Sequence, residues 1–177
     1  MFTRNSILRT LSVAAAIAIL APAASAQQQT PVNFSAVGGL SLPLGDLANS
    51  SELGLNLGFR GEGRRMNSGW SLRGDVSYDR YSGRGAIDNL SYLALAGNLV
   101  HRMAGSRAYQ FGGLGLYSSR VARTNLSDNT DMNLGVQMGL GADLTRDNRV
   151  FGEFGLTSAF TSGRSSVWFP VRVGLRF

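Results

Sequence analysis

Charged side chains of both signs recur at alternate positions in several short segments of this 177-residue chain. Arg73 and Asp75 fall on one face of such a segment, and Arg172 and Arg176 fall on one face of the last. Hydrolytic chemistry would usually need a serine activated by a histidine, and the chain contains one histidine, His101. The spacing therefore favours ion pairs across a closed interior over catalysis.

Nine charged residues are predicted to share that interior. They are Arg60, Glu62, Arg73, Asp75, Asp79, Asp143, Glu153, Arg172 and Arg176. Four positive and five negative side chains nearly neutralise each other, which predicts a hydrogen-bonded ionic plug in place of an apolar core. One alternative is a narrow ion-conducting pore lined by Arg73, Asp75 and Arg172.

No metal site or cofactor is predicted. The chain has no cysteine, so thiolate metal ligands and disulfides are excluded. Asp128 and Asp131 are too few carboxylates for a calcium site, which needs six to eight oxygens. Nucleic-acid binding is not expected either, because the arginines are scattered along the chain instead of forming one basic patch.

The last segment shows which kind of element positions these charges. Its apolar residues recur every second position, at Phe169, Val171, Val173, Leu175 and the terminal Phe177. Arg172, Gly174 and Arg176 alternate with them, which is the period of a β-strand with two unlike faces. In a membrane barrel the apolar face contacts lipid and the polar face lines the lumen. Pro170 cannot donate a ladder hydrogen bond, so a local irregularity is expected there.

The same alternation predicts eight strands, of which the outward and inward faces can be assigned for all but the fifth. Their approximate ranges are 32–42, 53–62, 70–80, 89–102, 109–118, 132–144, 150–160 and 167–177. The fifth contains Gly112 and Gly113, where a bulge could change the facing. The predicted fold is all-β, an eight-stranded antiparallel up-and-down transmembrane β-barrel.

The connections and the aromatic residues agree with that fold. Connections after odd strands are expected to be the longer, exterior ones, at 43–52, 82–88, 119–130 and 161–165, with both termini on the periplasmic side. Aromatic residues fall near both ends of the strands, which predicts two interfacial girdles. The residues of the exterior girdle are Tyr78, Tyr81, Tyr92, Tyr117, Phe160, Trp168 and Phe169; those of the periplasmic girdle are Phe34, Phe59, Trp70, Tyr109, Phe151 and Phe177.

Residues 1–26 have the three parts of a cleavable Sec-type signal peptide. A basic start with Arg4 and Arg9 precedes an apolar run, and Ala24-Ser25-Ala26 forms a small-x-small cleavage site. The run is shorter than the ~20 residues of a spanning helix. Residues 27–177 are therefore predicted to form a single barrel domain exported to the cell outer membrane.

Four features carry a resemblance to a known family: this signal, the first strand ending in Gly39-Leu40-Ser41-Leu42-Pro43-Leu44-Gly45-Asp46, the glycine-rich Gly112 to Tyr117, and the segment from Pro170 to Phe177. In these features the chain resembles the outer-membrane protein beta-barrel domain family, small eight-stranded barrels similar to OmpA and OmpX. The resemblance implies a monomer, a structural or surface-interaction role, and a C-terminal signal, Phe169 to Phe177, read by the barrel-insertion machinery. The first and third exterior loops are expected to meet an extracellular partner. The arginines nearest the outer rim are candidate contacts for lipopolysaccharide: Arg80, Arg84, Arg120 and Arg123. The resemblance also leaves an outer-membrane enzyme that modifies lipid A as an alternative function. A soluble periplasmic barrel of the lipocalin type is the alternative fold.

Overall fold

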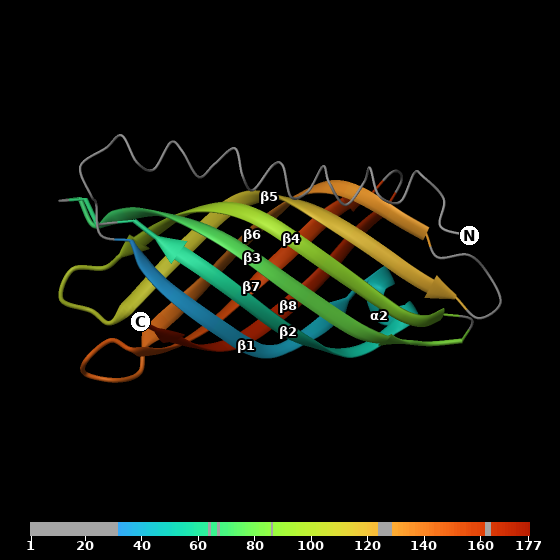
Figure 1. Ribbon diagram of the computed structural model, residues 1–177, viewed down its shortest axis with the longest axis horizontal. Helices are drawn as coiled ribbons and strands as arrows, with labels where there is room; N and C mark the ends of the chain where they lie inside the picture. Colours follow the sequence, from blue (N-terminus) through green and yellow to red (C-terminus); the bar gives the residue numbers. More distant parts are fainter. Residues whose placement is uncertain (1–31, 64, 67, 86, 124–128, 162–163) are drawn as a thin grey trace, which may run out of the picture. The chain divides into compact units, whose positions relative to one another are not determined.

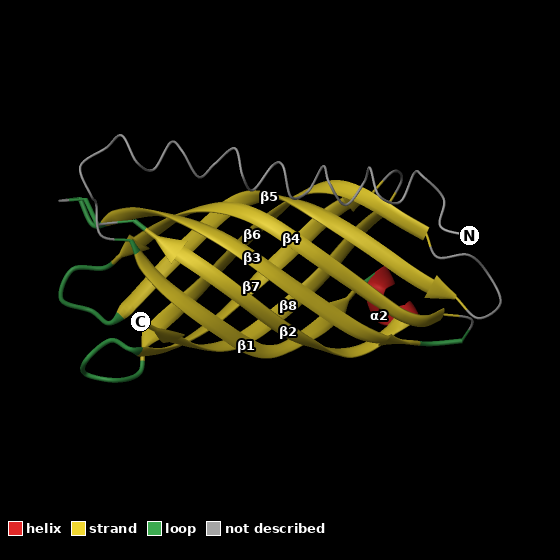
Figure 2. Ribbon diagram, viewed as in Figure 1, coloured by secondary structure: helices red, strands yellow, loops and turns green. Residues whose placement is uncertain are grey.

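A computed structural model describes residues 32–63, 65–66, 68–85, 87–123, 129–161 and 164–177. The predicted signal peptide, residues 1–26, lies outside the described residues. Eight strands form one closed barrel in which each strand pairs antiparallel with the next and β8 pairs with β1 (Figures 1 and 2). The strands are β1 (Asn33–Leu44), β2 (Ser51–Glu62), β3 (Trp70–Gly83), β4 (Ile87–Arg102), β5 (Ala108–Arg123), β6 (Asn129–Asp143), β7 (Val150–Thr161) and β8 (Arg164–Arg176). The predicted all-β barrel fold is confirmed.

Two ends of the barrel can be distinguished by the chain termini. The backbone N–H of Phe177 donates to the carbonyl of Phe34 at 3.0 Å, so the beginning and the end of the described barrel meet at one end. We call this the terminal end and the opposite one the far end. The turns from β2 to β3, from β4 to β5 and from β6 to β7 lie at the terminal end because the strands run antiparallel.

Apolar side chains cover the outside of the barrel and polar ones fill the inside, as the alternation predicts. Leu55, Leu57, Leu114 and Leu134 are each 64–69% exposed. Between them, inward positions such as Asn56, Arg60 and Asn133 are buried. A lipocalin-type barrel has the opposite arrangement, with its apolar residues inside, so the alternative fold is wrong.

Strand β5 alternates without interruption. Its pairing with β6 shows no register shift, and Gly112 and Gly113 form no bulge. Tyr109, Phe111 and Tyr117 consequently point inward and are buried, while Leu114 and Leu116 are exposed outside. Pro170, by contrast, lies where the pairing of β7 with β8 is interrupted, between the Phe154–Val171 and Thr157–Trp168 pairs. The irregularity expected at Pro170 is confirmed.

The far-end connections are shorter than the sequence predicts because the strands continue past the predicted ends. β5 runs to Arg123 instead of 118, and β6 begins at Asn129. The pairs Val121–Asn129 and Ile87–Arg123 extend the sheet to this rim. The expectation of long far-end loops is therefore wrong, since about half of those residues are in strands.

The first far-end connection contains a short helix instead of an open loop. Helix α2 (Asp46–Ser50) places Leu47 inside the barrel mouth, where that side chain is buried. The Ser51 hydroxyl donates to the Leu47 carbonyl at 2.7 Å and closes the helix at its end. Among the described residues, no helix has the length and apolarity that crossing a membrane requires.

Six of the thirteen predicted girdle residues face the interior instead of the outside, so the prediction is wrong for them. Tyr81, Tyr92, Tyr117 and Trp168 at the far end, and Tyr109 and Phe151 at the terminal end, are buried inside the barrel. Each of them is an even number of residues from an inward side chain of the same strand, so it faces the interior as well. The predicted girdle residues that do face outward are Phe34, Phe59, Trp70 and Phe177 towards the terminal end, and Tyr78, Phe160 and Phe169 towards the far end.

Candidate functional site: an ion-paired barrel interior

Glu153 on β7 lies at the centre of the ionic interior. Its carboxylate accepts a hydrogen bond from Arg73 Nη1 at 2.9 Å and from the Tyr109 hydroxyl at 2.8 Å. Arg60 Nη1 is 2.7 Å from the other carboxylate oxygen. These groups come from four strands and are all buried, so the three contacts bind opposite walls of the barrel together.

Two aspartates extend this interior towards the far end. Asp75 lies 3.1 Å from Arg73 Nε and 3.5 Å from Arg60 Nε, and accepts a hydrogen bond from the Asn98 amide at 2.8 Å. Asp79 accepts hydrogen bonds from the Ser41 hydroxyl and the Asn56 amide. Neutral donors thus add hydrogen bonds to carboxylates that also face the arginines.

Arg172 is the third arginine of this central layer. It is buried on β8 opposite Glu153 in the strand register, within the field of Asp79, Glu153 and Asp75. The three arginines, Arg60, Arg73 and Arg172, together balance the charge of the three central carboxylates, Glu153, Asp75 and Asp79.

A second ionic layer crosses the terminal end. Arg102 Nη2 is 3.2 Å from Glu62, and Arg102 Nη1 is 3.5 Å from Asp143. Arg176 Nη1 is 2.7 Å from the other oxygen of Asp143. The four residues alternate around the barrel on β2, β4, β6 and β8, so this network joins every second strand. Arg102 was missing from the predicted set, although its parity on β4 is that of the inward Asn98.

The described interior is therefore balanced in charge. Its five arginines are Arg60, Arg73, Arg102, Arg172 and Arg176, and its five acidic residues are Glu62, Asp75, Asp79, Asp143 and Glu153. The structure brings together all nine of the charged residues that the sequence predicted for the lumen, and adds one.

Aromatic rings separate the two ionic layers. The Arg73 guanidinium lies 4.4 Å from the Phe111 ring centre, and Arg176 lies 4.3 Å from that of Phe151. Arg102 lies 4.6 Å from the ring centre of Tyr109. Cation–π contacts of desolvated arginines contribute roughly 2 kcal/mol each. The rings therefore fill the lumen and at the same time stabilise the buried charges.

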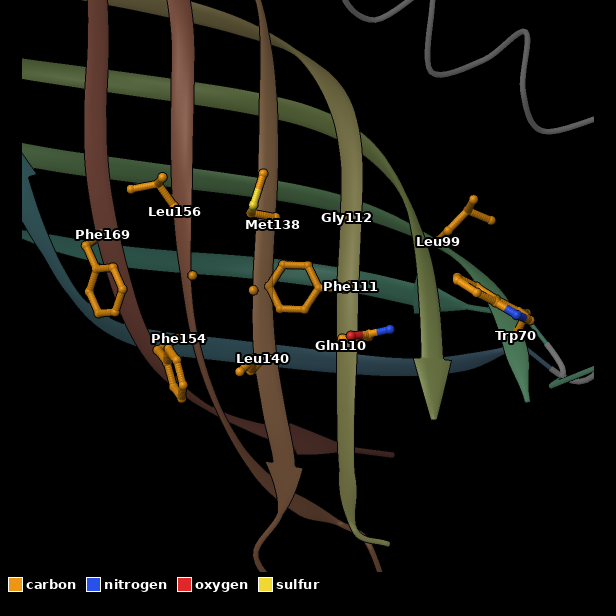
Figure 3. Close-up of a pocket in the computed structure, with 12 residues that line it drawn as sticks. Trp70, Leu99, Gln110, Phe111, Gly112, Met138, Leu140, Phe154, Leu156 and Phe169 are labelled. Carbon is orange, nitrogen blue, oxygen red and sulfur yellow. The ribbon is translucent and has the colours of Figure 1, made fainter. Parts of the chain in front are cut away.

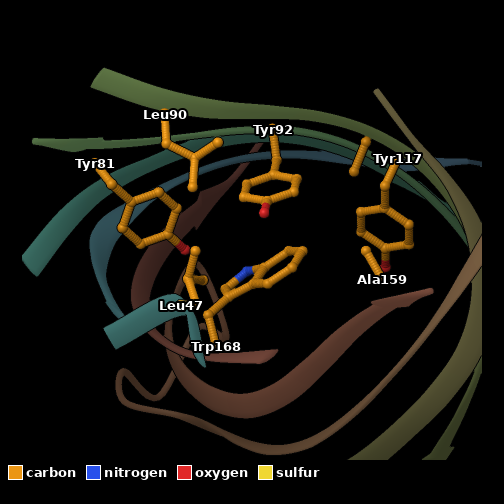
Figure 4. Close-up of a cluster of buried hydrophobic side chains, with 8 residues drawn as sticks. Leu47, Tyr81, Leu90, Tyr92, Tyr117, Ala159 and Trp168 are labelled. Atoms are coloured by element: carbon orange, nitrogen blue, oxygen red, sulfur yellow. The ribbon is translucent and has the colours of Figure 1, made fainter. Parts of the chain in front are cut away.

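An apolar cluster fills the far end of the interior, and we call it the aromatic cap (Figure 4). Its members are Leu47, Tyr81, Leu90, Tyr92, Ala94, Tyr117, Ala159 and Trp168. The Trp168 ring stacks on Tyr92 with centroids 4.7 Å apart and meets the edge of Tyr117 at 5.7 Å. Figure 4 shows Leu47 of α2 beside Tyr81 and Trp168, so the helix is part of this cap.

The interior thus consists of a cap, a central ionic layer, a layer of rings and a terminal ionic layer. An eight-stranded barrel has an interior just wide enough for side chains to fill it. The chemistry of these groups is mutual neutralisation and hydrogen bonding. Among the described residues no cluster of three or more His, Cys, Asp or Glu could hold a metal ion.

The outer wall carries a shallow apolar hollow of about 600 Å³ (Figure 3). It lies over Gly112, where the absence of a side chain leaves a gap between Leu99 and Met138. Trp70 lies beside this hollow, and its ring packs on His101 with centroids 4.6 Å apart. The single histidine is therefore an outer-wall residue near the terminal end and has no place in the ionic interior.

Of the four arginines considered as lipopolysaccharide contacts, two lie together. Arg80 and Arg120 line one pocket near the far end. Arg84 instead donates to the Ala48 carbonyl at 3.2 Å and lies 3.7 Å from Glu52, which ties the β3–β4 turn to α2. The Arg123 side chain lies outside what the structure describes.

The C-terminal segment has the facing that the sequence predicts. Val171, Val173, Leu175 and Phe177 are exposed on the outer wall, and Phe169 is half-buried beside Phe154, with ring centroids 6.0 Å apart. The Phe177 ring lies 6.0 Å from Phe59. These contacts place the last residue within an outward aromatic group at the terminal end.

No protein-family model and no curated protein sequence matches the chain. Solved structures match it in fold. Neisserial surface protein A is 18% identical, with a TM-score of 0.54 over 82% of this chain and 95% of that one. The attachment invasion locus protein Ail of Yersinia pestis is 17% identical, with a TM-score of 0.57 over 82% and 97%. The N-terminal β-barrel domain of Pseudomonas aeruginosa OprF is 15% identical, with a TM-score of 0.53 over 85% and 100%.

The chain therefore has the architecture of the small eight-stranded outer-membrane barrels, with a lumen filled by its own ionic and aromatic side chains.

Proposed function

We propose that this chain is an integral outer-membrane protein of the outer-membrane β-barrel family, exported by residues 1–26, with a structural or surface-interaction role. The observation that carries this proposal is the contrast between the two surfaces of the barrel. Leucine, valine, methionine and phenylalanine cover the outside, while five arginines and five acids neutralise each other inside. So large an exposed apolar surface suits lipid and would promote aggregation in water.

The terminal end would then face the periplasm and the far end the cell exterior. Both termini of a bacterial outer-membrane barrel of even strand number lie on one side, and strand pairing here ends with both at the terminal end. The closed barrel has no free edge strand, which supports a monomer.

The lumen is proposed to be closed, because side chains occupy it from cap to terminal layer. Glu153 alone holds Arg60, Arg73 and Tyr109 across the barrel axis. The pore hypothesis can be tested by planar-bilayer conductance. Steady ion-selective steps that change in Arg172→Ala would overturn the closed-lumen proposal, and a silent bilayer supports it.

A non-enzymatic role is proposed on the position of the histidine. His101 packs on Trp70 at the terminal end, whereas an enzyme acting on outer-leaflet lipid needs its base at the far end. Hydrolysis of labelled lipid A that disappears in His101→Ala would contradict this proposal.

The far end is proposed as the interaction surface. Its strands continue to the rim, and α2 is held there by Arg84 and by the burial of Leu47, so paired strands and a helix form the described part of this surface. One structure of Ail is a complex with a heparin analogue, sucrose octasulfate. An extracellular partner of this chain would likewise meet the paired rim strands and α2.

Cell fractionation with heat-modifiable gel mobility tests the membrane proposal. A folded membrane barrel should be recovered with the outer membrane and should migrate differently before and after boiling. Recovery of the chain only in the soluble periplasmic fraction would contradict it.

A further inference from the structure

Two arginines on different strands flank a serine on the outer wall near the far end. Arg80 of β3 is opposite Ser91 of β4, and Ser91 is opposite Arg120 of β5. Neighbouring strands are about 4.8 Å apart, so the backbones of the two arginines are roughly 10 Å apart. Both side chains are exposed and long enough to reach a common point above Ser91.

The space between them is a pocket of about 380 Å³, which we call the Arg80–Arg120 pocket. It is lined by Tyr78, Arg80, Asn89, Ser91, Arg120 and Ala122. Ser91 is only 8% exposed and lies at its floor. None of these six described lining residues is acidic, whereas guanidinium, amide and hydroxyl groups all offer hydrogen-bond donors.

The pocket lies beyond the apolar belt of the outer wall. The outward residues before Arg80 on β3 are Leu72, Val76 and Tyr78, and the sequence of apolar residues ends at this tyrosine. Tyrosine is favoured where the hydrocarbon meets the polar headgroups. Arginine on a lipid-facing wall is costly at the bilayer centre and tolerated near the interface. Arg80 and Arg120 would therefore lie at the depth of lipid headgroups.

The described side chains of β1 and β2 include no arginine at this depth. On β1 and β2, the outward residues near the far end are Leu42, Leu44 and Leu53, all exposed. A general ring of basic residues would include that side as well. The pairing of two arginines over a small residue is thus a local feature of β3 to β5.

We propose that Arg80 and Arg120 together bind the phosphate group of a phosphorylated glycolipid of the outer leaflet, of the lipid A type. Guanidinium groups form paired hydrogen bonds with phosphate oxygens, and two such groups match its charge. Asn89 and Ser91 supply further polar groups for the adjoining sugar. This inference rests on the proposed outer-membrane location.

The test measures binding of fluorescent bisphosphorylated lipid A to the full-length barrel folded in a neutral maltoside detergent. Arg80→Gln combined with Arg120→Gln should weaken binding by about tenfold or more, because two charge-assisted contacts are lost. The matched control is Arg107→Gln combined with Arg146→Gln, which removes the same charge from exposed terminal-end turns and should leave the affinity unchanged. Equal weakening in both variants would overturn the proposal, since the effect would then be one of net charge.

Two further arms identify the ligand. Lipid A lacking both phosphates should bind the unsubstituted protein as weakly as bisphosphorylated lipid A binds the double variant, and equal binding of the two lipids would reject phosphate recognition. Inorganic phosphate at millimolar concentration should compete poorly, and full competition would indicate a free-anion site instead of a lipid site. Heat-modifiable mobility and outer-membrane recovery are measured for each variant. If the barrel folds and is recovered with the outer membrane but binds both lipids equally, this inference alone is contradicted. If the chain is recovered only in the soluble fraction, the proposed function is contradicted.

Discussion

The ring of Phe151 on β7 lies directly over Gly174 of β8, its partner in the strand register. A Cβ atom built on Gly174 would be 2.2 Å from Phe151 Cζ, which is closer than any real contact. The same relationship joins Tyr109 to Gly141 and Phe111 to Gly139 across β5 and β6. Inward glycines therefore provide the space into which the rings fold, so the barrel contains its large aromatic residues without widening.

Gly174→Ala should destabilise the barrel by about 1–3 kcal/mol, because the new methyl group would displace the Phe151 ring from beneath Arg176. Gly97→Ala is the matched control, since a Cβ there meets nothing within 4 Å. The measurement is urea unfolding in lipid vesicles followed by tryptophan fluorescence. The control should be neutral or slightly more stable, and an equal loss in both variants would show that the ring contact has no role.

Glu153→Gln should lower the free energy of unfolding by roughly 3–5 kcal/mol, because it leaves buried Arg60 and Arg73 without their shared carboxylate. Glu52→Gln provides the comparison. Glu52 pairs with Arg84 at 3.7 Å with both side chains more than half exposed, and such pairs contribute about 0–1 kcal/mol. The same unfolding assay reports both. If the two variants are equally stable, solvation by water and not the Glu153 carboxylate must stabilise the central arginines.

The facing of nearly every strand could be predicted because apolar side chains outside and charged ones inside leave a strict two-residue period. The inward facing of the nine lumen charges follows from this alternation. The same alternation applies to Arg102, which is an even number of residues from inward Asn98 but lies at the end of its strand. The alternation also explains why the predicted outward facing of six aromatic residues is wrong. Depth along the strand places Tyr81 and Trp168 in the girdle, but each is an even number of residues from an inward charge, Asp79 or Arg172.

Two features lay beyond sequence reasoning. Arg73 and Glu153 are 80 residues apart, and their contact depends on the stagger of the closed barrel, which alternation does not encode. Alternation could not predict the far-end strand extensions, because polar residues such as Ser119, Arg120 and Thr130 lie on both faces there. Where both faces of the strand are polar, the two-residue period disappears although the backbone pairing continues.

Leu114→Arg should destabilise the membrane-inserted barrel by about 2–4 kcal/mol, because Leu114 lies on the outer wall in the middle of β5. Met132→Arg is equally exposed but lies near the far end of β6, so its cost should be about 0–1 kcal/mol. Vesicle unfolding of both variants measures this depth dependence. A water-soluble barrel would tolerate both changes alike.

Trp168→Ala should remove the centre of the aromatic cap without opening a conducting path. The loss of its stacking on Tyr92 and Tyr117 is expected to cost about 3–5 kcal/mol. The ion pairs around Glu153 remain below the cap, so planar bilayers containing the variant should show no steady steps. Regular conductance in this variant would show that the cap alone closes the lumen. The unsubstituted protein, measured in the same bilayers, is the control.

Phe177→Ser should slow assembly in cells while leaving the folded barrel nearly as stable as before. The Phe177 ring is 65% exposed and packs beside the Phe59 ring on the outer wall, so we expect few packing contacts to depend on it. Its backbone N–H, which bonds to Phe34, is unaffected by the substitution. Pulse-chase analysis of the heat-modifiable form should show delayed appearance of folded protein, while refolding of purified chain into detergent proceeds at an unchanged rate.

The control is Phe34→Ser, which changes another exposed aromatic residue of the terminal end and should leave assembly in cells at its normal rate. Equal delay in cells and in detergent would assign the effect to folding itself and contradict recognition of this residue by the insertion machinery.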